Sequence, residues 1–206
     1  MSDVLDALDH DATYAEIEVA GAELAGEDAR GVTFRAATLT GVDLSGAQLE
    51  RLRLVEVELR DCNLANVKAR NADLRRATIA NCRLTGIELT EAKLRDVTIR
   101  DCRVDLASFA YSTLERVVFA DCVLTQTDFL EAQLDAPRFE RCVLERADLR
   151  GARFHRAELR GCELAGAEGV ESLRGAAMPW PDIVAQAGVW AAALGIRALD
   201  DEEPGS

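Results

Sequence analysis

From Phe34 to Leu164 the chain places an apolar residue at every fifth position, without a single interruption. Among the 27 residues in this phase, only Ala69 lacks a bulky side chain. A period of five fits neither the 3.6-residue helix nor the two-residue strand, so each unit must combine a short extended piece with a turn. A second and smaller inward residue, usually Ala, Val or Cys, lies two positions before each bulky one.

The six cysteines of the 206-residue chain follow a longer period of 20, which is four of the shorter units. Four units can close a square coil, and stacked coils pair their backbones at the strand spacing of about 4.8 Å. Equivalent residues then form columns along the stack, and an internal repeat of this kind is typical of a solenoid. We expect one structural column to contain Cys62, Cys82, Cys102, Cys122, Cys142 and Cys162.

Several five-residue units resemble the pentapeptide repeat, whose pattern is Ala-(Asp/Asn)-Leu-X-X. The clearest are Ala47–Arg51, Ala72–Arg76 and Ala147–Gly151. The resemblance is strong over residues 31–168 and weaker over residues 19–30. It implies an all-β solenoid, a right-handed quadrilateral β-helix. A helical repeat would instead need units of about 33 to 47 residues and a coiled coil would need heptads, and the sequence shows neither.

Sorting the bulky residues by the 20-residue period assigns them to four faces of the square. Phenylalanines gather between residues 109 and 139, so we expect the core to be widest or most rigid there. Pro137 occupies a small inward position, and because proline lacks an N–H we expect a bulge or a distorted corner at that point. The columns that define the first, second, third and fourth faces contain Leu44, Leu49, Phe34 and Leu39, respectively.

The even number of cysteines leaves a disulfide interpretation open, since stacked neighbours would lie near bonding distance. We favour reduced thiols, because each occupies a small inward site where a thiol acts as a compact apolar group. The sequence shows no basic stretch followed by an apolar one that would direct export, so we expect a cytoplasmic protein. The longest apolar stretch, around Val189–Ile196, is too short to span a membrane. A straight thiol ladder does not converge, so we expect no metal and no cofactor.

The repeat pattern ends after Ala167, and residues 169–198 are expected to hold a C-terminal α-helix that begins near Pro181 and ends at Gly195. Such a helix could cap the open edge of the last coil. It is more apolar than a cap requires, which favours a homodimer formed through this helix. The expected interface residues are Trp180, Ile183, Val184, Ala187, Trp190, Ala191 and Leu194.

The two ends of the chain are expected to differ from the repeats, which we place at residues 19–168. Residues 1–18 carry Val4 and Leu8 at helical spacing and are expected to cap the first coil. Residues 199–206 are acidic and are expected to form a disordered tail.

The net charge of −13 is concentrated at the two ends of the chain. Residues 1–30 hold nine acids and one base, whereas residues 31–168 hold 22 acids and 21 bases. Within the repeats the third face is rich in arginine and the second face is acidic. Solvated surface charge is the ordinary interpretation of any one such face. The acids of the second face that we single out for partner binding are Glu50, Glu88, Glu91, Asp128, Glu131 and Asp148.

Catalysis is the function class that the sequence favours least. The chain has two histidines, and it shows no phosphate-binding loop, nucleophile elbow or metal-ligand spacing. The core columns predict a filled interior, so no deep substrate pocket is expected. We therefore expect a protein that acts by binding other molecules and not as an enzyme.

The uninterrupted repeats and the expected C-terminal helix resemble the loop-free, MfpA-like and Qnr-type members of the family, which protect DNA gyrase from its poisons. The resemblance implies a rigid acidic rod that mimics DNA and binds DNA gyrase or topoisomerase IV. The alternative is an interaction scaffold for a different cytoplasmic protein. Direct binding of nucleic acid is not expected, because the arginine-rich third face lacks exposed aromatic residues for stacking.

Overall fold

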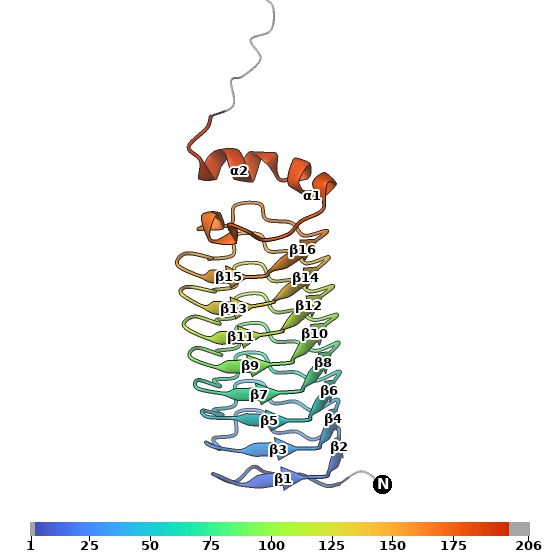
Figure 1. Ribbon diagram of the computed structural model, residues 1–206. Coiled ribbons are helices and arrows are strands. Elements are labelled where there is room, and N and C mark those ends of the chain that lie inside the picture. The colour runs from blue at the N-terminus through green and yellow to red at the C-terminus, as the bar shows by residue number, and fades with distance from the viewer. Residues whose placement is uncertain (1–2, 198–206) are drawn as a thin grey trace, which may run out of the picture.

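The computed structural model describes residues 3–197 and confirms the quadrilateral β-solenoid that the five-residue period predicts. The chain winds upward in regular coils, and two helices close the C-terminal end of the stack (Figure 1). Two of the four faces are regular parallel sheets of eight strands each, in which every strand pairs with the strand 20 residues later.

Each strand is three residues long and has the bulky residue at its centre, pointing inward. The third face consists of β1 (Thr13–Ala15), β3 (Thr33–Arg35), β5 (Arg53–Val55), β7 (Asp73–Arg75), β9 (Lys93–Arg95), β11 (Thr113–Glu115), β13 (Gln133–Asp135) and β15 (Arg153–His155). The fourth face consists of β2 (Glu18–Ala20), β4 (Thr38–Thr40), β6 (Glu58–Arg60), β8 (Thr78–Ala80), β10 (Thr98–Arg100), β12 (Val118–Ala120), β14 (Arg138–Glu140) and β16 (Glu158–Arg160).

The first and second faces are held by isolated parallel bridges instead of continuous strands. Asp43 pairs with Asn63 on the first face, and Gln48 pairs with Lys68 on the second. Backbone hydrogen bonds still join the coils there, as where the Leu44 amide donates to the carbonyl of Asn63 at 2.8 Å. All four sides of each coil are therefore bonded to the next, which makes the stack rigid.

The corners of the square depend on left-handed backbone. From Asp11 to Gly166 every fifth residue has a positive φ, and from Glu16 onward each lies two positions after a residue of the inward core columns. None of these corner residues is Val, Ile or Thr, whose branched side chains are poorly tolerated in this conformation. Most are Gly, Asp, Asn or long polar residues, so the corner positions carry a sequence signal of their own.

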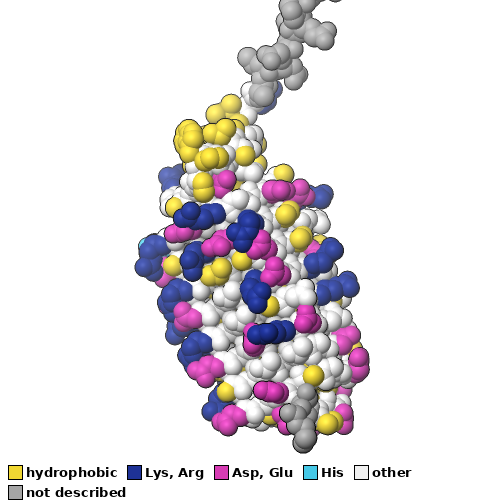
Figure 2. Space-filling model, turned by 90° about the vertical axis from the view of Figure 1, so that its right-hand side faces the viewer, with side chains coloured by type: hydrophobic (Ala, Val, Ile, Leu, Met, Phe, Trp, Pro, Cys, Tyr) yellow, Lys and Arg dark blue, Asp and Glu magenta, His cyan; other side chains and the backbone are white. Residues whose placement is uncertain are grey.

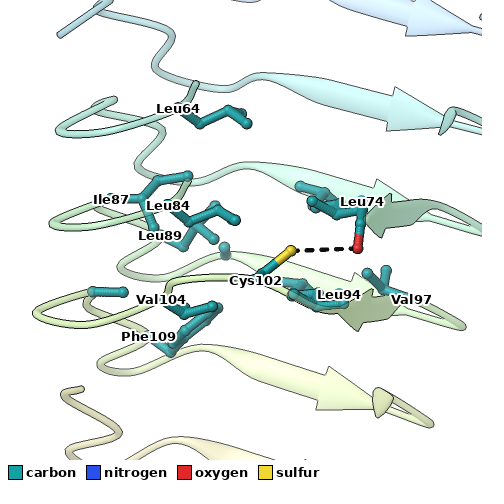
Figure 3. Packing of buried hydrophobic residues seen from close by; sticks show 14 of the residues in the cluster. Leu64, Leu74, Leu84, Ile87, Leu89, Leu94, Val97, Cys102, Val104 and Phe109 are labelled. Atoms are coloured by element: carbon teal, nitrogen blue, oxygen red, sulfur yellow. Dashed lines mark hydrogen bonds between the residues drawn. The ribbon is translucent and has the colours of Figure 1, made fainter. Parts of the chain in front are cut away.

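The inward columns fill the interior, and Figure 3 shows Leu64, Leu84 and Val104 stacked above one another on the first face. The expected phenylalanine cluster forms two ring stacks. Phe109 lies 5.2 Å from Phe129 with an interplanar angle of 8°, and Phe119 lies 5.1 Å from Phe139 with an angle of 6°. The stacks meet edge to face, as at 5.8 Å between Phe109 and Phe119, so aromatic contacts tie four units together.

All six cysteines are buried free thiols in one column. The Cys62 thiol donates to the carbonyl of Leu39 at 3.4 Å, and Cys142 donates in the same way to Phe119. The hydrogen bond with the neighbouring Cys82 thiol, together with burial, raises the pKa of Cys62 well above its usual range. All six thiols are shielded from reagents in solution by their burial.

The expectation of a bulge at Pro137 is wrong. The register of β12, β14 and β16 is unbroken on either side of it, and the Pro137 carbonyl accepts from the Glu158 amide at 3.0 Å. The equivalent residues of the adjacent coils, Val117 and Ala157, donate no backbone hydrogen bond from their amides. A proline therefore loses nothing in this column, because the missing N–H is one that the ladder does not use.

The segment 1–18 was expected to cap the first coil. It instead contains all of β1 and the first residue of β2, and both strands belong to the parallel sheets. Tyr14 occupies the phase of the core column, and its ring stacks on Phe34 with centroids 5.3 Å apart. The helical spacing of Val4 and Leu8 produces no helix. Leu8 is nevertheless buried against the first coil, whereas Val4 is 84% exposed.

The C-terminal helix is broken into two, after a 3-10 helix η1 (Val170–Leu173): α1 (Trp180–Ala185) and α2 (Ala187–Ala193). Gln186 lies at the break and bonds the open edge of the last coil. Its side chain accepts from the Leu164 amide at 3.3 Å and donates to the Cys162 carbonyl at 3.2 Å.

Asp182 completes this cap by accepting from the Gly161 amide at 2.6 Å.

The expected tail 199–206 lies outside the described residues. Among residues 3–197, none of the helices combines the length and the apolar character that a membrane span requires.

Candidate protein-binding surface

The six acids expected to bind a partner all lie on the second face, but at different distances from the corner. Glu88, Asp128 and Asp148 occupy the bridge positions that join successive coils. Glu91 and Glu131 are corner residues in left-handed backbone, with φ of 58° and 51°. Both of these corner residues are exposed.

Three of these six acids are already paired with arginines of the same face. Asp148 binds Arg150 at 2.6 Å, and this hydrogen bond is the main cause that lowers the pKa of Asp148. Glu88 lies 3.4 Å from Arg70. Glu50 lies 3.9 Å from Arg30. The second face is therefore less acidic in effect than its acids alone suggest.

The remaining acids have no basic partner in an ion pair among the described residues. Asp128 accepts from the Ser108 hydroxyl at 3.1 Å and from the Leu130 amide at 2.8 Å. The carboxylates of Glu91 and Glu131 make no hydrogen bond or ion pair within residues 3–197. These two residues are two coils apart in one corner column, about 10 Å along the rod.

The arginine-rich third face is neutralised in part by its own acids. Arg116 binds Asp96 at 2.6 Å, and Arg95 binds Glu115 at 2.7 Å in the adjacent coil. Closer to the C-terminal end, the Asp135 carboxylate accepts a hydrogen bond from Arg156 and makes another with the His155 ring. These two hydrogen bonds lower the pKa of Asp135 to about 2. Part of the basic surface that the sequence suggests is thus a ladder of exposed ion pairs, each of small energy, whereas Arg35, Arg53, Lys93 and Arg153 form no ion pair within residues 3–197.

The C-terminal helices and the residues directly after them expose several large apolar side chains. Trp180 is 73% exposed, Val184 56% and Leu194 75%, and Ile196 extends the same surface. Figure 2 shows hydrophobic side chains gathered at the C-terminal end, above the coils, whereas basic and acidic side chains are interspersed over the visible side face.

The seven residues expected in a dimer interface divide into two groups. Trp190 packs against the core, and its indole N–H donates to the Ile183 carbonyl at 3.1 Å. Ile183 and Ala191 are also partly buried, so these three mainly hold the helices on the coil. The exposed group is Trp180, Val184, Ala187 and Leu194.

Two exposed apolar residues of the second face were not expected to contribute to a site. Leu106 is 57% exposed and Tyr111 is 52% exposed, and both occupy corner positions in left-handed backbone. The signal that could have found them is their chemistry: the other corner residues are polar, Gly or Ala. Among residues 3–197, no group of three or more His, Cys, Asp and Glu side chains converges as metal ligands would.

The sequence matches the profiles of a known protein family. Residues 52–119 and 105–168 match the sequence profile of the pentapeptide repeat region, and residues 20–54 match that of pentapeptide repeats (8 copies). A search of the curated proteins gives no match.

Several solved structures are similar to this chain. One is a trypsin-treated variant of QnrB1, a plasmid-mediated fluoroquinolone resistance protein, with 19% identity over 97% of this chain and 100% of that one, and a TM-score of 0.43. Another is HetL of the cyanobacterium Nostoc sp. strain PCC 7120, a pentapeptide repeat protein involved in heterocyst differentiation regulation. It is 22% identical over 83% of this chain and 91% of that one, with a TM-score of 0.37. A third, from the Arabidopsis thaliana thylakoid lumen, is 19% identical over 48% and 62%, with a TM-score of 0.35.

Proposed function

This chain belongs to the pentapeptide-repeat family, and from that premise we propose that it mimics DNA and binds a type II topoisomerase, either DNA gyrase or topoisomerase IV. In this role it acts without catalysis and protects the enzyme from topoisomerase poisons. The observation that carries the proposal is the acidic second face, where Glu91 and Glu131 project unpaired carboxylates from a rigid rod. A surface that binds phosphates is basic and attracts such a rod.

The dimensions of the rod support this role. Eight strands in each sheet give seven spacings of about 4.8 Å, or about 34 Å, which matches one turn of duplex DNA. The side chains are presented on backbone that is hydrogen-bonded on every face, so little ordering is needed on binding. The ion pairs of the third face reduce the repulsion that unpaired arginines would create near a basic partner.

A homodimer would extend the acidic surface across a two-fold axis. We place its interface at the exposed apolar side chains of Trp180, Val184, Ala187 and Leu194 on α1 and α2. These residues leave more apolar surface in water than the cap on the last coil requires. Two-fold symmetry would suit a partner that is itself two-fold symmetric.

The proposal is tested by titrating the protein into a DNA supercoiling assay with purified gyrase, with and without a fluoroquinolone. Wild type should inhibit supercoiling at high concentration and reduce drug-induced cleavage at lower concentration. The double variant E91Q/E131Q should need a concentration roughly tenfold higher or more, because two unpaired charges are lost at the interface. The matched variant E145Q, on the first face, should behave as wild type.

A scaffold for another cytoplasmic protein is the second candidate. It is favoured by the pairing of Glu50, Glu88 and Asp148 with arginines, which leaves fewer free charges than a phosphate mimic would present. Absence of inhibition, protection and binding in the gyrase experiments would favour this alternative. Salt-dependent binding of the protein itself to duplex DNA would contradict both candidates.

A further inference from the structure

Leu106 and Tyr111 are exposed apolar residues at corner positions, where the other residues are polar, Gly or Ala. Both have left-handed backbone, with φ of 60° and 59°, which is unfavourable for any residue other than Gly, Asn or Asp. Burial does not compensate for this, because more than half of each side chain is exposed. In the same two corner columns Asn66 and Asn71 show the residue type that the conformation favours. The fold therefore gains little from a leucine and a tyrosine here, and departures of this kind are expected at functional sites.

The two residues flank one short segment of the second face, and this segment lies over the most aromatic part of the core. Phe109, midway between them, is fully buried and contacts both Phe119 and Phe129. The Leu106 amide donates to the Thr125 carbonyl at 3.0 Å, and the Tyr111 amide donates to Leu130 at 2.9 Å. Both side chains are thus held on a backbone that cannot move away from a partner.

The surroundings of the pair are acidic. Glu91 and Glu131 occupy the corner column of Tyr111, one coil before it and one coil after it, and both carboxylates are unpaired within the described residues. Glu88 and Asp128 flank Ser108 in the bridge column. Leu106 and Tyr111 thus lie beside an acidic rim of Glu88, Glu91, Asp128 and Glu131, and large apolar side chains next to charged residues are the kind of side chain that contributes most to binding energy at protein interfaces.

We propose that Leu106 and Tyr111 are apolar anchors at the two edges of the acidic second face, and that each inserts into an apolar recess of a basic protein surface. Charge complementarity selects a partner that presents Lys and Arg around such a recess. The acidic rim excludes a nucleic acid, whose phosphates it would repel. The inference rests on the proposed function and deepens it, because the topoisomerase would be recognised by an apolar contact as well as by its affinity for negative charge.

The closing experiment measures the affinity of immobilised gyrase holoenzyme for wild type and for four variants. L106N and Y111N place the favoured corner residue at each position, so their thermal unfolding should match or exceed that of wild type. Y111E continues the glutamates of the same column and adds a negative charge. A136N changes a corner between the third and fourth faces and serves as the matched control.

The anchor predicts that L106N and Y111N each weaken binding about tenfold or more, and that A136N does not. Y111E separates the two kinds of recognition: it weakens binding if the ring is an anchor, and it strengthens binding if negative charge alone is recognised. Unchanged affinity of L106N and Y111N, or tighter binding of Y111E, overturns the anchor and leaves the proposed function standing. Failure of wild type to bind gyrase overturns both.

Discussion

Replacement of Phe129 by alanine should be among the most damaging single changes in the chain. The side chain is fully buried, and its ring contacts Phe109 at 5.2 Å, Phe139 at 6.1 Å and Phe119 at 6.3 Å. A buried Phe-to-Ala change costs about 3–5 kcal/mol, and each aromatic pair contributes about 0.5–1.5 kcal/mol beyond its buried area. The coil cannot collapse into the cavity, because the Phe129 amide is bonded to Asp148 at 2.8 Å. We therefore expect a loss of about 5 kcal/mol.

The matched control is F154A, which has the same chemistry near the end of the stack. Phe154 is only partly buried, and among residues 3–197 its ring pairs with one other aromatic ring, that of Phe139 at 6.4 Å. Its loss should cost roughly 2–3 kcal/mol, below the usual range for a fully buried ring. Equilibrium urea unfolding followed by far-ultraviolet circular dichroism measures both, from the midpoints and a common slope. A cost for F129A below about 2 kcal/mol, or no larger than that of F154A, would refute this account of the core.

Four further outcomes are expected. A157P should change the free energy of unfolding by less than about 1 kcal/mol, whereas A132P should cost more, because the Ala132 amide donates a hydrogen bond at 3.0 Å; urea unfolding compares them. The pKa of Asp135 is lower in the folded protein than the value near 3.9 expected in the unfolded chain, so ionised Asp135 stabilises the fold above that pH. This stabilisation should be lost as the pH falls toward about 2, and the melting temperature measured over this range should fall with it. The cysteines should not react with a thiol reagent until the protein unfolds. V184D should convert dimer to monomer in sedimentation velocity, with the Trp180 surface left exposed.

The core could be predicted from the sequence because its two periods leave little freedom. For a residue such as Leu74, the period of five predicts that the side chain points inward, and the period of 20 predicts which residues lie above and below it. The structure confirms both, because Leu74 pairs with Leu54 and Leu94 in the adjacent coils. Tyr14 lies in the same five-residue phase, but its polar hydroxyl and the acidic residues around it kept the sequence pattern from predicting the first coil. The C-terminal helix is interrupted at Gln186, whose side chain donates a hydrogen bond to the Cys162 carbonyl of the last coil. No local sequence pattern predicts this contact.

The surface could be predicted only in part, because long charged side chains choose among neighbours on the same coil and on adjacent coils. Arg75 binds Asp73 within its own strand at 2.6 Å, whereas the next residue, Arg76, reaches Glu56 in the preceding coil at 2.8 Å. Counting charges on a face therefore identified the acidic second face without showing which carboxylates remain free. The corner rule became visible once the backbone dihedrals assigned every fifth residue to the left-handed region.

Competition with DNA for gyrase tests the central claim most directly. A labelled duplex bound to gyrase holoenzyme is titrated with the protein, and its fluorescence anisotropy is followed at constant ionic strength. If the second face occupies the DNA site, the duplex is displaced completely, and E91Q/E131Q displaces it only at higher concentration. A ternary complex in which protein and duplex are bound together, or displacement that is equal for wild type and E91Q/E131Q, would contradict the account.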